Sequence, residues 1–224
     1  MGYFFVLSLN LFDREIDFDR VLKLNNYCLA IKILDDIVDN DLTYRPMELL
    51  DIVCQDIEKQ SLDLSELESH AFDITKMVMR DIGYSNNPGL QRATFELKES
   101  AKKSLEATNL KEHLKAEYEV GYSAGEVAAY ALIPDIDPES NFMIYMRNTG
   151  VAGTLIDNIK NLRNDKKNFD LNGNLVSYLF SSTLLASRNG VSGLIHVPSG
   201  KKLEFIKLLM HYIKPLMSNF RGRN

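Results

Sequence analysis

Residues 18–41 read FDRVLKLNNYCLAIKILDDIVDND, and this stretch decides the fold class. Its apolar residues recur at intervals of three and four, which is the period of one face of an α-helix. The stretch therefore predicts a single long helix with a buried stripe that ends in a group of aspartates. The stripe consists of Phe18, Val21, Leu22, Leu24, Tyr27, Cys28, Ile31, Leu34 and Val38.

The same helical period continues along the chain, with almost no alternating strand pattern, so we predict an all-α fold. No linker of low complexity and no internal repeat interrupts it. We therefore expect one helical-bundle domain over residues 1–224. The expected helices are 1–12, 18–38, 46–57, 64–82, 89–108, 110–132, 142–162, 175–187 and 203–220, with a flexible stretch at 189–200.

Composition excludes several classes of function. A net charge of −5 without a clustered basic face argues against a nucleic-acid partner. No apolar run approaches ~20 residues, so we expect no stable membrane insertion. The apolar start at 1–12 lacks a basic leader, and we interpret it as a core helix rather than a signal peptide. Cys28 and Cys54 have no partner at metal-ligand or redox spacing, which predicts buried thiols and a cytoplasmic location.

The first acidic cluster ends the long stripe. On a helix, Asp35 and Asp39 lie at i,i+4 and Asp36 and Asp39 at i,i+3, so the three carboxylates share one face. Their mutual repulsion needs an offsetting cation, most strongly where water is excluded. Oxygen-only ligands favour Mg²⁺.

A second cluster of oxygen ligands comes roughly 120 residues later. Asp157, Asn161 and Asp165 stand at i, i+4 and i+8 on one helical stripe. Either cluster alone is compatible with a solvated acidic helix end. Two such clusters, each at the polar end of an apolar helix, predict metal ligation.

These residues resemble the motifs of the class I isoprenoid synthases. Asp35-Asp36-Ile37-Val38-Asp39 resembles their aspartate-rich DDxxD motif, and Asp157-x-x-x-Asn161-x-x-x-Asp165 is similar to the second metal motif of terpene cyclases. Residues 168–176 are similar to the stretch that follows that motif, and 118–125 to the helix whose break near a glycine senses the diphosphate. The resemblance covers roughly residues 18–180, and the first motif comes early enough that one or two of the usual N-terminal helices are expected to be absent.

The resemblance implies a Mg²⁺-dependent terpene synthase, a lyase that ionises a prenyl diphosphate substrate and cyclises or rearranges the carbocation. It implies three Mg²⁺ ions held with the diphosphate, and a homodimer is compatible with it. The implied metal and catalytic residues are Asp35, Asp36, Asp39, Asp157, Asn161 and Asp165. The candidate diphosphate-binding residues are Arg163, Lys166, Lys167 and Arg147.

A carbocation would need an apolar, π-rich cavity. The aromatic residues that we consider for it are Phe95, Tyr118, Tyr122, Phe142 and Tyr145, for which ordinary core packing is the alternative. The small residues Ala124, Gly125, Ala128 and Ala129 would either leave room for an isoprenoid tail or allow close helix packing.

Two other functions stay open. A prenyltransferase is suggested by residues 35–45, which resemble DDxxDxxxxRR with Tyr44 in place of the first Arg. However, Ser123-Ala124 stand where elongating enzymes have Lys-Thr. A catalytically reduced partner subunit of a prenyl synthase is suggested by the missing basic residues, among them the sensor arginine, which is Gly121 here. An unrelated di-metal bundle is disfavoured because the chain lacks Glu-x-x-His pairs.

Overall fold

The computed structural model describes residues 2–41, 66–161 and 175–207 of the 224-residue chain. Every regular element in these ranges is helical, which confirms the predicted all-α class. Within them, no helix combines the length and the apolar composition that a membrane span requires. The α-helices are α1 (Gly2–Leu11), α2 (Phe18–Asp41), α4 (Glu66–Asp81), α5 (Pro88–Glu106), α6 (Leu110–Leu132), α7 (Asn141–Asn161) and α8 (Leu175–His196), with 3₁₀ turns at Tyr84–Asn86 and Ser199–Lys201.

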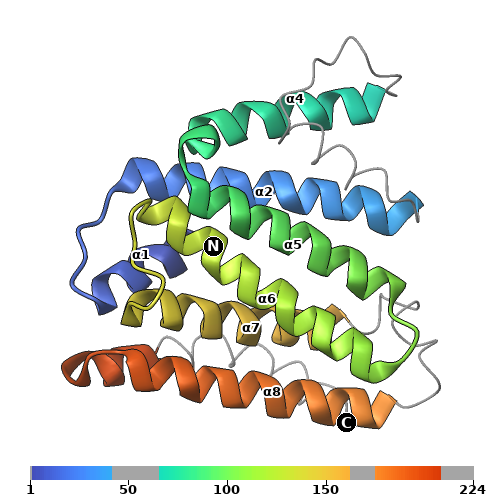
Figure 1. Cartoon of the computed structure of the whole chain (residues 1–224). Helices are drawn as coiled ribbons and strands as arrows, with labels where there is room; N and C mark the ends of the chain where they lie inside the picture. The colour runs from blue at the N-terminus through green and yellow to red at the C-terminus, as the bar shows by residue number, and fades with distance from the viewer. Residues whose placement is uncertain (1, 42–65, 162–174, 208–224) are drawn as a thin grey trace, which may run out of the picture.

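The long helices form an up-and-down bundle (Figure 1). Helices α2, α5 and α7 run in one direction, and α4, α6 and α8 run in the other. We call the end where α2 and α7 finish the acidic end, because residues 35–41 and Asp157 belong to those last turns. We call the end where α6 finishes and α7 begins the paired end. Helix α6 contacts α2, α5 and α7 and so lies at the centre of the bundle.

Local sequence signals set where the helices begin and end. The side-chain oxygens of Asn87 and Asn109 accept hydrogen bonds of 3.0 Å from the backbone N–H groups of Leu90 and Glu112, which caps α5 and α6. Pro88 occupies the first turn of α5, where its missing N–H costs nothing. Gly83 follows α4 with a φ of 76°, a left-handed conformation that glycine adopts without strain.

The core lies where α1, α2, α5, α6 and α7 converge. Its fully buried members include Leu24 on α2, Leu90 on α5 and Phe142 and Tyr145 on α7. Phe5, Leu9 and Leu11 of α1 belong to the same cluster, which confirms the prediction of a core helix near residues 1–12.

Helix α6 is continuous from Leu110 to Leu132, so it lacks the break that the resemblance implies near a glycine. Instead, glycines bring the backbones of α6 and α7 together. A Cβ on Gly121 would lie 2.5 Å from the Cα of Val151, and one on Gly125 would lie 2.7 Å from the Cα of Arg147. A Cβ on Gly150 would lie 2.9 Å from the backbone nitrogen of Gly125. The small residues of α6 therefore serve close helix packing, the second of the two roles considered for Gly125.

Helix α8 is longer than predicted. We expected a helix to end at 187 and a flexible stretch at 189–200, but α8 continues to His196. The weak helix formers in this segment are held by contacts. The Asn189 amide donates to the carbonyl of Leu185 at 2.8 Å, and Gly193 packs close to the side chain of Thr149 on α7. Tertiary packing therefore overrides local propensity here.

Two other predicted helices are described only in part or not at all. The chain is helical at 202–207, within the predicted helix 203–220, and the rest of that helix lies outside the described residues. The predicted helix at 46–57, with Cys54, also lies outside them.

Candidate functional site

The first predicted metal motif lies in the last two turns of α2. Asp35, Asp36 and Asp39 are helical, as the sequence predicts, and their helix finishes at the acidic end (Figure 1). The structure describes the backbone here but not the side chains of 32–41.

The second predicted motif begins in the last turns of α7. Asp157 is exposed, and Asn161 is the last residue of the helix. Asp165 and the predicted diphosphate-binding residues Arg163, Lys166 and Lys167 lie outside the described residues. Because α2 and α7 run in the same direction, both motifs belong to helix ends at the acidic end of the bundle.

Beside Asp157, a half-buried cluster of polar side chains joins three helices. We call it the Glu117 cluster, and it consists of Ser104 on α5, His113 and Glu117 on α6, and Asn158 on α7. The Ser104 hydroxyl and the Asn158 amide each donate a short hydrogen bond to the Glu117 carboxylate. The partners of Glu117 in this part of the described chain are therefore neutral donors.

The geometry of the cluster fixes the tautomer of a neutral His113. Its Nδ1 lies 3.2 Å from the Ser104 oxygen, whose single hydrogen is already donated to Glu117. Nδ1 must therefore carry the proton and donate it, which leaves Nε2 as an acceptor. His113 is buried, and its Nε2 has no hydrogen-bond partner among the described residues.

Helix α8 carries a second buried polar atom that lacks a hydrogen-bond partner among the described residues. The Ser182 side chain is fully buried, and its hydroxyl finds no hydrogen-bond partner within the part of the chain that the structure describes. Ser182 lies one turn after Tyr178, whose ring centroid is 5.8 Å from that of His113. Buried polar groups are almost always paired, so each of these two atoms marks a place able to hold a water molecule or a polar ligand atom.

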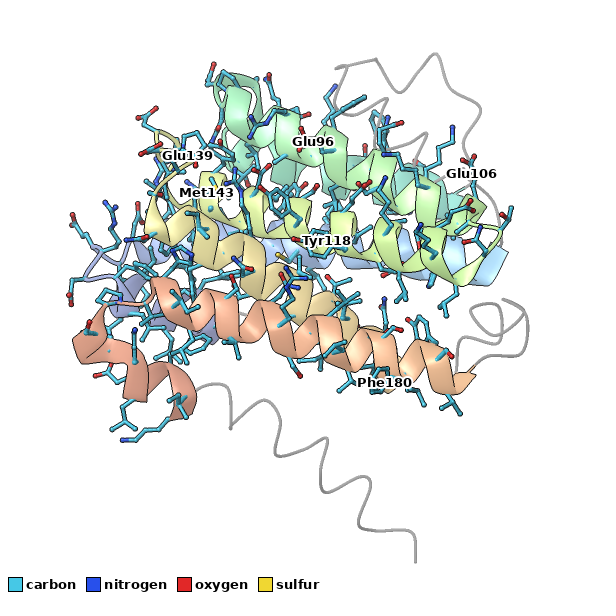
Figure 2. All side chains as sticks on the ribbon, turned by 60° about the horizontal axis from the view of Figure 1, so that its bottom comes forward. Glu96, Glu106, Tyr118, Glu139, Met143 and Phe180 are labelled. Carbon is cyan, nitrogen blue, oxygen red and sulfur yellow. The ribbon has the colours of Figure 1, made fainter. Side chains whose placement is uncertain are left out.

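An aromatic cavity of about 480 Å³ opens between α5 and α6, within the volume range of small-molecule sites. Of the five aromatic residues considered from the sequence, Phe95, Tyr118 and Tyr122 line it, whereas Phe142 and Tyr145 are fully buried in the core. Figure 2 shows Tyr118 near the middle of the bundle. The other lining residues are Glu96, Glu99, Ser100, Lys103, Glu119 and Ser123.

The three carboxylates that line this cavity are already ion-paired. Glu119 pairs with Lys103 at 3.2 Å, Glu99 with Lys98 at 3.3 Å and Glu96 with Arg92 at 3.8 Å. The two tyrosine rings are stacked with centroids 6.4 Å apart, and the Arg147 guanidinium lies 5.0 Å from the centroid of the Tyr122 ring, a cation–π contact. Burial raises the pKa of the Tyr122 phenol, and the nearby Arg147 guanidinium offsets only part of that effect, so this ring stays neutral.

Arg147, a candidate diphosphate-binding residue, already forms hydrogen bonds and an ion pair at the paired end. Its Nε donates to the buried Glu126 carboxylate at 2.9 Å, and a terminal nitrogen donates to the carbonyl of Pro138 at 2.8 Å. Arg92 reaches the other Glu126 oxygen at 3.5 Å and the Tyr130 hydroxyl at 3.2 Å. A diphosphate would have to displace Glu126 to bind Arg147.

Candidate metal ligands do not form a cluster in the described part of the chain. No group of three or more His, Cys, Asp or Glu side chains suited to a metal ion occurs there. Cys28 is partly buried, and burial raises the pKa of its thiol to about 11, which keeps the thiol protonated. Since most side chains of the two predicted motifs fall outside the description, the Mg²⁺ site stays a prediction.

Sequence reasoning missed the Glu117 cluster. A signal was present, because His113 and Glu117 stand at i,i+4 and Asn158 directly follows Asp157. What the sequence cannot supply is the arrangement of α5 against α6, which brings Ser104 to both residues.

Comparisons with known proteins give no match to a family model, to a curated protein or to a solved structure.

Proposed function

We propose that the protein is a Mg²⁺-dependent class I isoprenoid synthase that ionises a prenyl diphosphate and acts as a terpene cyclase. One observation carries the proposal. Helices α2 and α7 run in the same direction, so two oxygen-ligand motifs far apart in the sequence belong to helix ends on one side of the bundle. A pair of clusters at one end of a bundle suits an ion cluster shared by both.

The donor set fits Mg²⁺. Asp35, Asp36 and Asp39 on α2, with Asp157 and Asn161 on α7, offer only oxygen atoms, which hard divalent cations prefer. Asp165 would complete the second set. When bound there, Mg²⁺ would stabilise the negative charge that develops on a leaving diphosphate.

The aromatic cavity suits the hydrocarbon end of such a substrate. Phe95, Tyr118 and Tyr122 supply π-faces, each worth ~0.5–2 kcal/mol towards a cation. Cations already occupy two of these positions, because Lys98 lies 4.9 Å from the Phe95 ring centroid and Arg147 lies 5.0 Å from that of Tyr122. The cavity lies along the middle of α5 and α6, between the paired end and the acidic end. Its aromatic rings support carbocation stabilisation, with the diphosphate bound at the helix ends.

A second candidate is a catalytically reduced partner subunit of a prenyl synthase. The continuous α6 and the engagement of Arg147 by Glu126 favour it, because both remove diphosphate-sensing features that the resemblance implies. Prenyl chain elongation has less support, since Ser123 lines the cavity at the position where elongating enzymes have lysine.

The proposal is tested by diphosphate release and volatile-product analysis. Geranyl, farnesyl and geranylgeranyl diphosphates are supplied one at a time, with and without Mg²⁺, and then with isopentenyl diphosphate. The variants are Asp36→Ala and Asp157→Ala, and Asp19→Ala is the matched control because it removes an exposed carboxylate from the first turn of α2.

A cyclase gives Mg²⁺-dependent hydrocarbon or alcohol from a single substrate, and both site variants lose at least about 100-fold in rate while the control does not. Turnover that begins only with isopentenyl diphosphate would establish chain elongation instead. No turnover under any condition would contradict an enzymatic role and leave the partner-subunit function.

A further inference from the structure

The outward face of α8 carries an apolar stripe along its whole length. Its large apolar members are 58–78 % exposed, although such side chains are usually buried. Figure 2 shows Phe180 of this stripe on the outer side of the bundle. The stripe consists of Val176, Phe180, Leu184, Val191 and Ile195.

The rest of this face is nearly uncharged. The other exposed residues of α8 are Thr183, Ser187 and Arg188, so one charge occurs among eight exposed positions. A solvated helix face is normally rich in charged residues. The long Arg188 side chain can keep its charge in water while its stem covers apolar surface. The composition is that of a surface covered by another apolar surface.

The exposed area is large enough for a stable interface. With a full area of about 150–250 Å² for a large aromatic residue and somewhat less for an aliphatic one, the five apolar members present roughly 600 Å². The two small polar residues between them bring the face close to the ~800 Å² that each partner contributes to a standard interface. The largest apolar patch on a typical monomer is ~300–600 Å².

The exposed residues of α8 have the same spacing whether the helix is followed from its N-terminus or from its C-terminus. The exposed positions 176, 180, 183, 184, 187, 188, 191 and 195 map onto themselves when the helix is reversed about a point between 185 and 186. In an antiparallel pair, Val176 then faces Ile195, and Phe180 faces Val191. A two-fold interface requires such self-complementarity, because the same patch serves both subunits.

We propose that α8 pairs with α8 of a second copy of this chain, antiparallel about a two-fold axis near residues 185 and 186. A membrane is a less suitable occupant, because interfacial helices carry lysine and arginine along their polar face and the exposed part of α8 carries only Arg188. Dimerisation through α8 is independent of the proposed reaction.

The first test is the oligomeric state of the full chain, measured by sedimentation velocity over a range of concentrations. Phe180→Glu and Val191→Lys each weaken the dimer by at least about tenfold, because each places a charge in the buried centre of both contacts. Phe18→Glu is the matched control, because Phe18 and Phe180 have the same exposed fraction of 69 % but Phe18 is on α2. Far-ultraviolet circular dichroism verifies that all variants stay folded.

The second test is the orientation. A mixture of Val176→Cys and Ile195→Cys chains forms a disulfide-linked heterodimer faster than either chain forms a homodimer. Faster Val176→Cys homodimers would overturn the antiparallel arrangement. A wild-type chain that stays monomeric at all concentrations, or a dimer that Phe18→Glu weakens as much as Phe180→Glu does, would overturn the proposal. A monomer that sediments with phosphatidylcholine vesicles through this face would overturn it in favour of a lipid surface.

Discussion

Glu117 and Glu126 lie on the same helix and both receive a side chain from α7, yet their surroundings differ. At the paired end, Glu126 is buried and receives two guanidinium groups, from Arg147 and Arg92. At the acidic end, Glu117 is half-buried and receives a hydroxyl and an amide, both neutral. Among the described residues, the carboxylate of Glu126 therefore has cationic partners, whereas that of Glu117 has neutral ones.

The two carboxylates therefore differ in their capacity to bind a ligand. A buried carboxylate already paired with arginine has little capacity left for a ligand, and it fixes how α6 meets α7. Glu117 accepts from Asn158, next to Asp157 at the end of α7, and shares Ser104 with His113. We therefore expect a cation or a polar group to bind at the acidic end rather than at the paired end.

The largest expected difference is in the free energy of unfolding of two matched variants. Glu126→Gln leaves the Arg147 charge buried without a counter-ion and is expected to cost about 3–5 kcal/mol. Glu117→Gln keeps an acceptor for Ser104 and is expected to cost about 1–2 kcal/mol. Urea unfolding at pH 7 measures both. Equal losses would contradict the assignment of distinct roles to the two ends.

The close packing of α6 against α7 is tested by substitutions at two glycines of α7. Gly150→Ala places a methyl group against the backbone of α6 and is expected to cost about 1–3 kcal/mol or more. Gly153→Ala meets nothing within 4 Å and is expected to stabilise the helix by about 0.5–1 kcal/mol. Thermal unfolding should move the two variants in opposite directions. A neutral Gly150→Ala would show that α6 and α7 are not held this closely.

Much of this fold could be predicted from the sequence, because periodicity and capping act locally. The limits of α6 agree with the expected 110–132, since Asn109 begins it and Pro134 follows it. The end of α8 could not be predicted, because Asn189 and Gly193 become helical through contacts with Leu185 and with α7.

The sequence predicts which residues of the site share a helix face, but not how the helices are arranged around the site. The spacing of Asp35, Asp36 and Asp39 indicates one helix face, but not which other helix end lies on the same side of the bundle. That depends on chain direction, which Figure 1 shows for α2 and α7. The partners of Arg147 were equally hidden, because Glu126 is on another helix.

A smaller effect compares two fully buried serines. Ser8 donates to the Phe4 carbonyl at 2.9 Å and lies 3.2 Å from the Tyr145 hydroxyl, so Ser8→Ala is expected to cost about 1–2 kcal/mol. Ser182 has no hydrogen-bond partner in the described ranges, so Ser182→Ala is expected to leave stability unchanged or to raise it by up to about 1 kcal/mol. Chemical unfolding of both variants decides. A large loss in Ser182→Ala would mean that its hydroxyl has a bound partner in solution.

The smallest expected effect is the pH response of the first turn of α6. The backbone N–H and the hydroxyl of Thr108 donate to the Glu112 carboxylate and lower its pKa. A lowered folded-state pKa stabilises the protein above the ordinary pKa of glutamate, and this contribution disappears as the pH falls through the folded-state value. Carbon-13 NMR titration of Glu112 should show a low midpoint that moves part of the way towards the ordinary value in Thr108→Val, because the substitution removes the hydroxyl donor and keeps the backbone N–H. An unchanged midpoint in that variant would contradict the cap.

The most direct test of the central claim is the binding of Mn²⁺, as a spectroscopic substitute for Mg²⁺, measured by electron paramagnetic resonance with and without inorganic diphosphate. The account predicts that diphosphate promotes Mn²⁺ binding, and that Asp36→Asn and Asp157→Asn each abolish this effect, because the ends of α2 and α7 hold the ions together. Binding that persists in either variant, or no binding in the wild type, would contradict a shared metal site at the acidic end.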